Sequence, residues 1–305
     1  MKDSEIRKDY FTNNYVIIAP KRNKRPVNVA KEVESVITSC FFCPDQIDPK
    51  EVIMKYGGPK GGWNVLVIAN KFPALTIENK NAFGKQEVII ETPEHKKEIN
   101  HLSLEHIEEI IDVYMNRFET LKNIEGIRYV IVFKNEGGKA GASVAHSHSQ
   151  VIALPLVPPK IKGEYNDYAD YAMENDSCPY CDIIKNERGK ERVIFEDEHL
   201  FVLAPFASNS PYGAWFIPKR HFRLMSEMSI GEKQSFAKAM KRTLDKLDDI
   251  GYAYNYFFHN AVNSEDYHMH LKLSPRPNVW AGLELGTGII INPVPPEEAA
   301  KFYRE

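Results

Sequence analysis

The chain has 305 residues, of which 43% are hydrophobic and 11% aromatic, and its formal net charge is −3. This composition supports a substantial folded core and excludes a disordered or fibrous protein. The slightly acidic balance argues against a protein that binds nucleic acid through a broad basic surface. The N-terminal stretch MKDSEIRKDY lacks the apolar segment of a signal peptide, and the apolar runs are too short to cross a bilayer. We therefore expect a cytoplasmic protein without membrane contact.

The four cysteines form two pairs with identical spacing, Cys40 and Cys43 in SCFFCPD and Cys178 and Cys181 in SCPYCDI. In a reducing compartment, a Cys-x-x-Cys pair is more often metal-binding or redox-active than a structural disulfide. Neither pair is followed by a second pair nearby, so a four-cysteine site would require both pairs to meet.

The same order of features follows each cysteine pair. Segments typical of strands come first, then a histidine (His95 or His221), and eight residues later a serine (Ser103 or Ser229). Apolar residues recur at helical spacing behind each serine, which predicts that each serine caps a long helix.

A further strand is predicted in each half, over 128–133 and over 253–258, and each half then reaches a His-x-His motif. The chain is therefore interpreted as one unit used twice. This predicts an α+β fold of two tandem halves, each a mainly antiparallel sheet with a long helix. Prolines and polar residues over 156–177 suit a linker with some helix, so we expect one domain at 1–160 and another at 161–305.

Cysteine and histidine at these places suit zinc, because structural zinc sites prefer four tetrahedral sulfur and nitrogen ligands. The repeat predicts one such site in each half, and hence two structural zinc ions per chain. The predicted ligands are Cys40, Cys43, His95 and His146 in the first half and Cys178, Cys181, His221 and His268 in the second. His221 follows IPKR and would also fit a surface histidine in a basic cluster.

The stretch GASVAHSHSQVIALP (141–155) places His148 two residues after His146 and two before Gln150. Alternate residues of a strand share one face, so these three side chains are expected to point the same way. If His146 binds zinc, His148 is a free imidazole beside a rigid anchor and a candidate nucleophile or base. Gln150 would hydrogen-bond an oxygen of the group being attacked. The alternative is that His148 is a second metal ligand or a packed core histidine.

The segments 7–26 (RKDYFTNNYVIIAPKRNKRP), 70–75 (NKFPAL) and 135–150 (NEGGKAGASVAHSHSQ), with CFFC and TPEH, resemble the galactose-1-phosphate uridylyltransferases. This family belongs to the histidine-triad superfamily and is built from two such halves. The C-terminal stretch 282–305 is similar to the tail of small bacterial and archaeal members, so the resemblance covers nearly the whole chain.

The resemblance implies ping-pong transfer of a uridylyl group in galactose metabolism. His148 would attack the α-phosphorus of a UDP-sugar, a sugar 1-phosphate would leave, and a second sugar 1-phosphate would take the uridylyl group from the imidazole. The resemblance also implies a homodimer with the sugar site near the subunit boundary.

Roles for further residues follow from the resemblance alone. Gln150 would hold a non-bridging oxygen of the phosphoryl group, and the loop 137–143 would face the diphosphate with its amides. The residues expected at the substrate are Arg22 and Arg25 at the phosphates, Asn135 and Ser143 near the ribose and phosphates, and Phe41 and Asn70 at the base pocket. The two arginines would also fit a solvated basic run, and the phenylalanine an ordinary core position.

Two departures from the best-known transferases affect the active site. The motif is His-Ser-His-Ser-Gln, where those enzymes have proline and glycine between the same residues, and this form resembles ADP-glucose phosphorylase, which uses phosphate as acceptor. The acidic and amide residues that contact the hexose in those enzymes are not obvious here, where the tail reads GTGIIINPV.

The second half departs as well. It reads His268-Met-His270-Leu-Lys272, with lysine at the glutamine position, so we expect it to have lost catalysis and to act as scaffold with a contribution to the sugar site. Relatives with another second metal set have residues that match Glu164, His259, His268 and His270. The cysteine set is favoured because Cys178 and Cys181 are present, and since His268 belongs to both sets, only one of them can be complete.

The leading interpretation is a UDP-glucose:galactose-1-phosphate uridylyltransferase. The nearest alternative is ADP-glucose phosphorylase, or a dinucleoside-polyphosphate phosphorylase, acting through the same histidine. The alternative from another class is a non-catalytic zinc protein that binds nucleotides or RNA, but such a protein has no need for the pair formed by His148 and Gln150.

Overall fold

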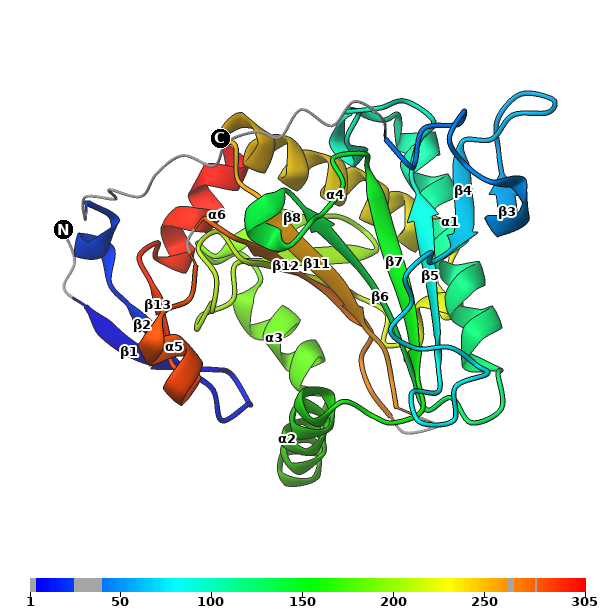
Figure 1. The fold of residues 1–305 in the computed structure, drawn as a ribbon. Coiled ribbons are helices and arrows are strands. Elements are labelled where there is room, and N and C mark those ends of the chain that lie inside the picture. Colours follow the sequence, from blue (N-terminus) through cyan, green and yellow to red (C-terminus); the bar gives the residue numbers. More distant parts are fainter. Residues whose placement is uncertain (1–3, 25–39, 263–265, 278) are drawn as a thin grey trace.

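The computed structural model describes residues 4–24, 40–262, 266–277 and 279–305. One large sheet of ten strands runs through it in the order β3-β4-β5-β7-β6-β11-β12-β10-β9-β8, and its neighbouring strands pair antiparallel (Figure 1). The strands of the first half are β3 (Val52–Tyr56), β4 (Val65–Ala69), β5 (Lys85–Ile90), β6 (Tyr129–Glu136) and β7 (His148–Leu154). Those of the second half are β8 (Val193–Glu196), β9 (Leu200–Leu203), β10 (Ala214–Pro218), β11 (Tyr254–His259) and β12 (His270–Pro275).

The strand order shows the internal repeat directly. Read from either edge, the strands appear in the same sequence, so β3 corresponds to β8, β4 to β9, β5 to β10, β7 to β12 and β6 to β11. The two halves meet where β6 pairs with β11, with Asn135 opposite Asn255. The predicted α+β fold of two mainly antiparallel halves is therefore confirmed.

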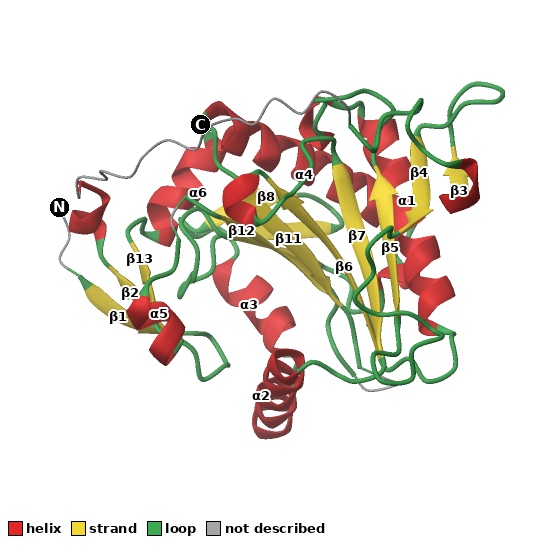
Figure 2. Cartoon of the chain, viewed as in Figure 1, coloured by secondary structure: helices red, strands yellow, loops and turns green. Residues whose placement is uncertain are grey.

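One long helix from each half covers the same face of the sheet. These are α1 (Leu104–Lys122) and α4 (Ile230–Asp249), which lie side by side behind the strands in Figure 2. Their apolar sides pack on the strands in one continuous core. The predicted caps are present: Ser103 Oγ accepts from the amide of His106, and Ser229 forms a capping box with Glu232. Such caps contribute about 1 kcal/mol each by satisfying amides that the helix leaves free.

Two helices cover the opposite face of the sheet over the second half, whereas Phe42 and Ile47 of a loop pack on it over β4 and β5. The two helices, α2 (Pro159–Asn175) and α3 (Pro179–Glu187), pack Tyr168 and Tyr180 against apolar residues of β9 and β10. The stretch 156–177, predicted as a linker with some helix, contains α2, and the predicted boundary at residue 160 falls within this helix. The division at that residue stays a prediction.

The two ends of the chain share a small second sheet. In it β2 (Tyr15–Ile18) pairs antiparallel with β1 (Glu5–Lys8) and parallel with β13 (Ile290–Asn292). The short α5 (Gly282–Thr287) precedes β13, and α6 (Pro296–Arg304) follows it and packs on α4 and β8. The 3-10 helices are η1 (Pro20–Lys24), η2 (Pro49–Glu51), η3 (Ile99–His101), η4 (Gly138–Ala140) and η5 (Met225–Glu227). Within the described residues, every helix is too short or too polar to cross a membrane.

Candidate active site and metal centres

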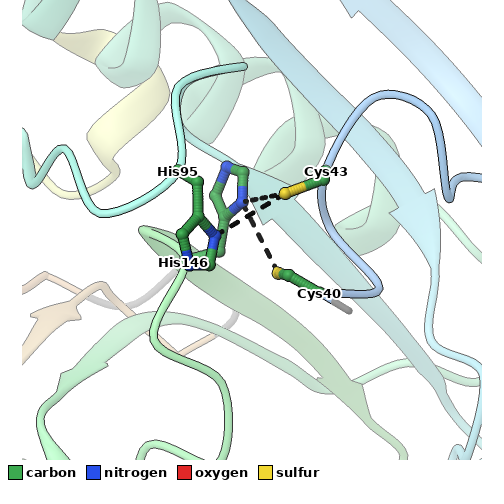
Figure 3. Close-up of side chains that lie close together, drawn as sticks. All are labelled: Cys40, Cys43, His95 and His146. Carbon is green, nitrogen blue, oxygen red and sulfur yellow. Dashed lines mark hydrogen bonds between the residues drawn. The ribbon is translucent and has the colours of Figure 1, made fainter. Parts of the chain in front are cut away.

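The four residues of the first predicted metal set lie together. Cys40 and Cys43 come from the loop before η2, His95 from the loop after β5, and His146 from the residues before β7 (Figure 3). The Cys43 sulfur lies 3.6 Å from Nδ1 of His95 and 3.8 Å from Nδ1 of His146, and the Cys40 sulfur lies 3.7 Å from the latter.

The second predicted set converges in the same way. Nδ1 of His268 lies 3.5 Å from the sulfurs of both Cys178 and Cys181, and Nδ1 of His221 lies 3.6 Å from the sulfur of Cys181. Cys178 is the residue before α3 and Cys181 lies in its first turn, so this helix carries the cysteine pair.

The donor geometry of both clusters fits zinc. With zinc–sulfur and zinc–nitrogen bonds of about 2.3 and 2.0–2.1 Å, the sulfur–nitrogen edge of a tetrahedron is about 3.6 Å. The observed separations, 3.5–3.8 Å, match that edge. Both clusters could therefore hold a metal ion.

The ring orientations of the buried histidines give a second test of this fit. Nε2 of His146 donates to the carbonyl oxygen of Thr92 (2.7 Å), and Nε2 of His268 donates to that of Pro218 (2.8 Å). A neutral imidazole that donates through Nε2 carries its lone pair on Nδ1, the atom that faces the sulfurs. Carbonyl partners of this kind fix the tautomer of metal-binding histidines.

The competing residues form a separate third cluster. Glu164, His259 and His270 place one potential ligand atom each within 4.8 Å of the others, whereas His268 lies with the cysteines. The third cluster already contains a cation, because Lys272 Nζ lies 2.6 Å from Oε1 of Glu164. Burial raises the pKa of Glu164, but Lys272 and then His259 outweigh it and hold the pKa well below its ordinary value. The carboxylate thus has a permanent partner without a metal.

His148 begins β7 and lies on the face of the sheet opposite α1, with 7% of its surface exposed. Its Nδ1 donates to the carbonyl oxygen of His146 (2.8 Å). Burial, and then the Lys134 ammonium, lower the pKa of His148, so its ring is neutral near pH 7. A neutral ring that donates through Nδ1 has its lone pair on Nε2, as a nucleophile requires.

Gln150 follows on the same strand and is half-buried, whereas Ser149 and Val151 between and beyond these residues face the core. The expected alternation therefore places the imidazole of His148 and the amide of Gln150 on one face. Phe42 was not predicted at this site, but its ring lies 5.0 Å from that of His148 in an edge-on arrangement. Two adjacent phenylalanines give no signal about which one turns inward.

The other residues expected at the substrate are more dispersed. Phe41 is 64% exposed, with Lys71 Nζ 5.7 Å from its ring centre. Asn70 accepts a hydrogen bond from the amide of Phe72 and so shapes the turn that opens NKFPAL. Ser143 and Arg22 are exposed, and Arg22 lies on η1, which begins two residues after β2 of the small sheet. Arg25 lies outside the described residues.

Asn135 connects the two halves at the active face. Its Oδ1 accepts from Asn255 Nδ2 (2.7 Å), which also donates to the carbonyl of Ala140 (2.8 Å). The loop 137–143 is thereby fastened to the second half. Its bend needs glycine at Gly137, which has φ 80° and would place a Cβ only 2.8 Å from that of Ala253.

A cavity of about 300 Å³ crosses the seam between β6 and β11 on this face. Asn135 and Asn255 line it, together with the cationic side chains of Lys160 and Arg276 and the ring of Trp280. The guanidinium of Arg276 lies 4.4 Å from the centre of that ring. Basic, amide and aromatic groups in one cavity suit a ligand with both phosphate and sugar parts.

Several known proteins are similar to this chain in sequence. A family model described as the N-terminal domain of DUF4931, a domain of unknown function, matches residues 21–157. The galactose-1-phosphate uridylyltransferase of Thermotoga maritima is 31% identical to this chain over 99% of it and 98% of the relative. The ADP-glucose phosphorylase of Arabidopsis thaliana is 32% identical over 99% of this chain and 92% of the relative.

The solved structures include an ADP-glucose phosphorylase from Arabidopsis thaliana with bound ADP-glucose, which superposes with a TM-score of 0.88 at 32% identity. The superposition covers 100% of this chain and 99% of that one. With this identity over almost the whole length, the chain belongs to the family of galactose-1-phosphate uridylyltransferases and ADP-glucose phosphorylases.

Proposed function

We propose that the protein is a nucleotidyltransferase that takes the nucleotidyl group of a nucleotide sugar onto His148 and passes it to a phosphate-bearing acceptor. One observation carries this proposal: the hydrogen bond from Nδ1 of His148 to the carbonyl of His146 leaves the lone pair on Nε2, with Gln150 on the same face. A binding protein has no need for the two features together.

The first half-reaction follows from that geometry. Nε2 attacks the α-phosphorus, a nitrogen–phosphorus bond forms, and the bond from phosphorus to the bridging oxygen breaks, so that sugar 1-phosphate leaves with the electron pair. The substituted ring keeps its Nδ1 proton and becomes cationic, which strengthens the hydrogen bond to the carbonyl of His146. The Gln150 amide can donate to a non-bridging oxygen as negative charge develops there.

In the second half-reaction an acceptor oxygen attacks the same phosphorus and the nitrogen–phosphorus bond breaks. The electron pair returns to Nε2 and the ring is neutral again. Zinc in the Cys40 cluster would cross-link the loop before η2 to the start of β7, and so fix the place of the nucleophile. We therefore propose zinc as the metal of both cysteine clusters, with a structural role. We also propose that the cavity at Lys160 and Arg276 is the subsite of the sugar 1-phosphate.

For the complete reaction, the first candidate is transfer of a uridylyl group from UDP-glucose to galactose 1-phosphate, which the Thermotoga maritima relative supports. The second candidate is phosphorolysis of ADP-glucose. It is supported by the TM-score of 0.88 with the ADP-glucose phosphorylase and by the serines of the His-Ser-His-Ser-Gln motif.

One experiment separates the candidates. Purified protein is incubated with UDP-glucose or ADP-glucose, each with galactose 1-phosphate or inorganic phosphate, and the nucleotides are separated by chromatography. UDP-galactose from the first combination supports the uridylyltransferase, and ADP from ADP-glucose with phosphate supports the phosphorylase. The matched control is His148→Ala, which should give neither product. Turnover by that variant, or none by the wild type in any combination, would exclude the proposed function.

We also propose that the protein forms a homodimer whose interface includes the small sheet and α5. Large apolar side chains are exposed on these elements: Ile6 (70%) on β1, Tyr15 on β2, and Leu283 and Leu285 (72%) on α5. Trp280, just before α5, is exposed as well. Several exposed apolar side chains on neighbouring elements favour an interface between copies. Light scattering coupled to size exclusion tests this, and a mass near 35.0 kDa, that of one chain, would contradict it.

A further inference from the structure

Beneath His148, on the side of the sheet that faces α1, lies a fully buried cluster of charged and hydroxyl side chains. Its members are Glu91 just after β5, Lys134 on β6, and the two serines that flank His148, Ser147 and Ser149. Each of the four is at most 1% exposed.

A single carboxylate holds both serines. Ser147 Oγ donates to Oε2 of Glu91 (2.6 Å), and Ser149 Oγ donates to Oε1 of the same carboxylate. Tyr114 of α1 also donates to Oε1 (2.6 Å). The hydroxyls of the residues immediately before and after His148 are therefore both hydrogen-bonded to the Glu91 carboxylate.

Lys134 completes the cluster. Its Nζ donates to Oε2 of Glu91 (2.6 Å) and to Oγ of Ser147 (2.8 Å), and it lies 3.1 Å from Glu98. Burial raises the pKa of Glu91, but Lys134 and then the serine hydroxyls outweigh it and hold the pKa at about 2. The carboxylate is thus ionised at neutral pH, and its hydrogen bonds are of the strong, charge-assisted kind.

The cost of this arrangement points to a purpose beyond stability. Apolar residues of similar size can replace a buried ion pair without loss of stability, because the pair must overcome the desolvation of two charges. What apolar residues cannot supply is fixed direction at two hydroxyls. Successive residues of a strand project to opposite faces of the sheet. Holding Ser147 and Ser149 in place on one face therefore also fixes the backbone position from which His148 projects on the other.

We propose that Glu91 and Lys134 are positioning residues for the nucleophile. Through Ser147 and Ser149 they hold the start of β7 so that Nε2 of His148 and the amide of Gln150 address one phosphoryl group. Glu91 also precedes Thr92, whose carbonyl orients His146, so the nucleophile and the adjacent metal ligand share one support. This inference rests on the proposed function, and it explains why serines stand on both sides of His148.

The test compares two deletions of one buried hydroxyl. Tyr114→Phe removes a donor to Glu91, whereas Tyr254→Phe removes a hydroxyl on β11 that is buried and has no hydrogen-bond partner in the described part of the chain. The single-turnover rate of nucleotidyl transfer to His148 is measured with the nucleotide sugar that the wild type uses, alongside its dissociation constant and the zinc content. A displacement of about 1 Å at a reacting group can cost about 100-fold in rate. We expect Tyr114→Phe to lose about 10- to 100-fold in that rate, with affinity and zinc within twofold of wild type, and Tyr254→Phe to match wild type.

A second pair of variants separates the hydroxyl from general packing. Ser149→Thr and Ser149→Val have nearly the same shape, but only the threonine keeps a donor to Glu91. The threonine variant should transfer at least tenfold faster than the valine variant at equal zinc content. Equal rates in this pair, or in the two tyrosine variants, would show that the cluster only stabilises the fold. Absence of label on His148 in the wild type would instead overturn the proposed function, and this inference with it.

Discussion

His148 and His270 occupy equivalent places in the two halves, and each donates through Nδ1 to the carbonyl of the histidine two residues before it, at 2.8 and 2.9 Å. Their other nitrogens differ. Nε2 of His270 lies 3.1 Å from the Tyr180 hydroxyl and 3.6 Å from Glu164, and its ring is fully buried. The duplicated backbone thus sets up two imidazoles alike, and α2 and α3 enclose the second one.

Covalent labelling should therefore be confined to the first half. Brief incubation with nucleotide sugar labelled in the α-phosphate should leave an acid-labile, base-stable adduct, as a phosphoramidate requires, and peptide mapping should place it on His148. His148→Ala should keep its zinc and bind nucleotide sugar without becoming labelled. His148→Gly should regain turnover with added imidazole, which can fill the vacated space. Label on the peptide that contains His270 would contradict the assignment.

The metal content should follow the two cysteine clusters one by one. Elemental analysis of protein purified without added metal should give about two zinc ions, the sum of two four-ligand sites. Cys40→Ser and His146→Ala should each lose one ion and destabilise the first half, and Cys178→Ser should lose the other. In these variants we expect the stability of the fold to fall before the transfer reaction itself is affected, because a structural metal contributes to folding. A native disulfide between Cys40 and Cys43, or protein without metal, would exclude this interpretation.

The repeat carries most of what the sequence predicts correctly. Equal spacing of cysteine pairs, capping serines and His-x-His motifs predicts the two halves, both long helices and the residues that the structure gathers around each cysteine pair. Such features recur in the same order and with the same local spacing, so one half identifies the matching residue in the other. The third cluster is different, because Glu164 on α2 has no counterpart in the repeat and only the packing of that helix brings it to Lys272.

The buried support of the nucleophile was missed, although a signal for it exists. Alternation along β6 places Val130, Val132 and Lys134 on the same face, and the first two lie in the apolar core. A lysine at the next core-facing position predicts a buried charge that needs a carboxylate. Which carboxylate serves cannot be read from the sequence, because Glu91 lies 43 positions away and meets Lys134 only through the pairing of β5, β7 and β6.

Breaking the ion pair between Glu164 and Lys272 should destabilise the second half. In Lys272→Met the carboxylate, whose side chain is 9% exposed, would lose its ammonium partner at 2.6 Å. Removing one partner of a buried pair costs about 3–5 kcal/mol, whereas replacing both is often close to neutral. Urea unfolding should show a loss of this size for Lys272→Met and a smaller one for the double variant Glu164→Gln/Lys272→Met. Equal losses in both would mean that the cluster matters for its packing and not for its charges.

The stability of the protein should depend on pH through Glu136, at the end of β6. Burial, and then the neighbouring Glu98 carboxylate, raise the pKa of Glu136 from 4.5 to about 8. Between these values the folded protein keeps a proton that the unfolded chain releases, so this residue's contribution to the free energy of unfolding falls as pH rises from about 4.5 to 8. Glu136→Gln removes the titration and should flatten this dependence. In urea unfolding at pH 5 and pH 8.5, the free energy of unfolding of the variant should therefore rise relative to that of the wild type at the higher pH.

Glu119→Gln is a suitable control, because its carboxyl has a lowered pKa, held chiefly by a hydrogen bond from Lys122, and should not titrate in this range. If the difference between Glu136→Gln and wild type is the same at both pH values, the carboxyl of Glu136 is ionised throughout and Glu98 is not close enough to hold its proton.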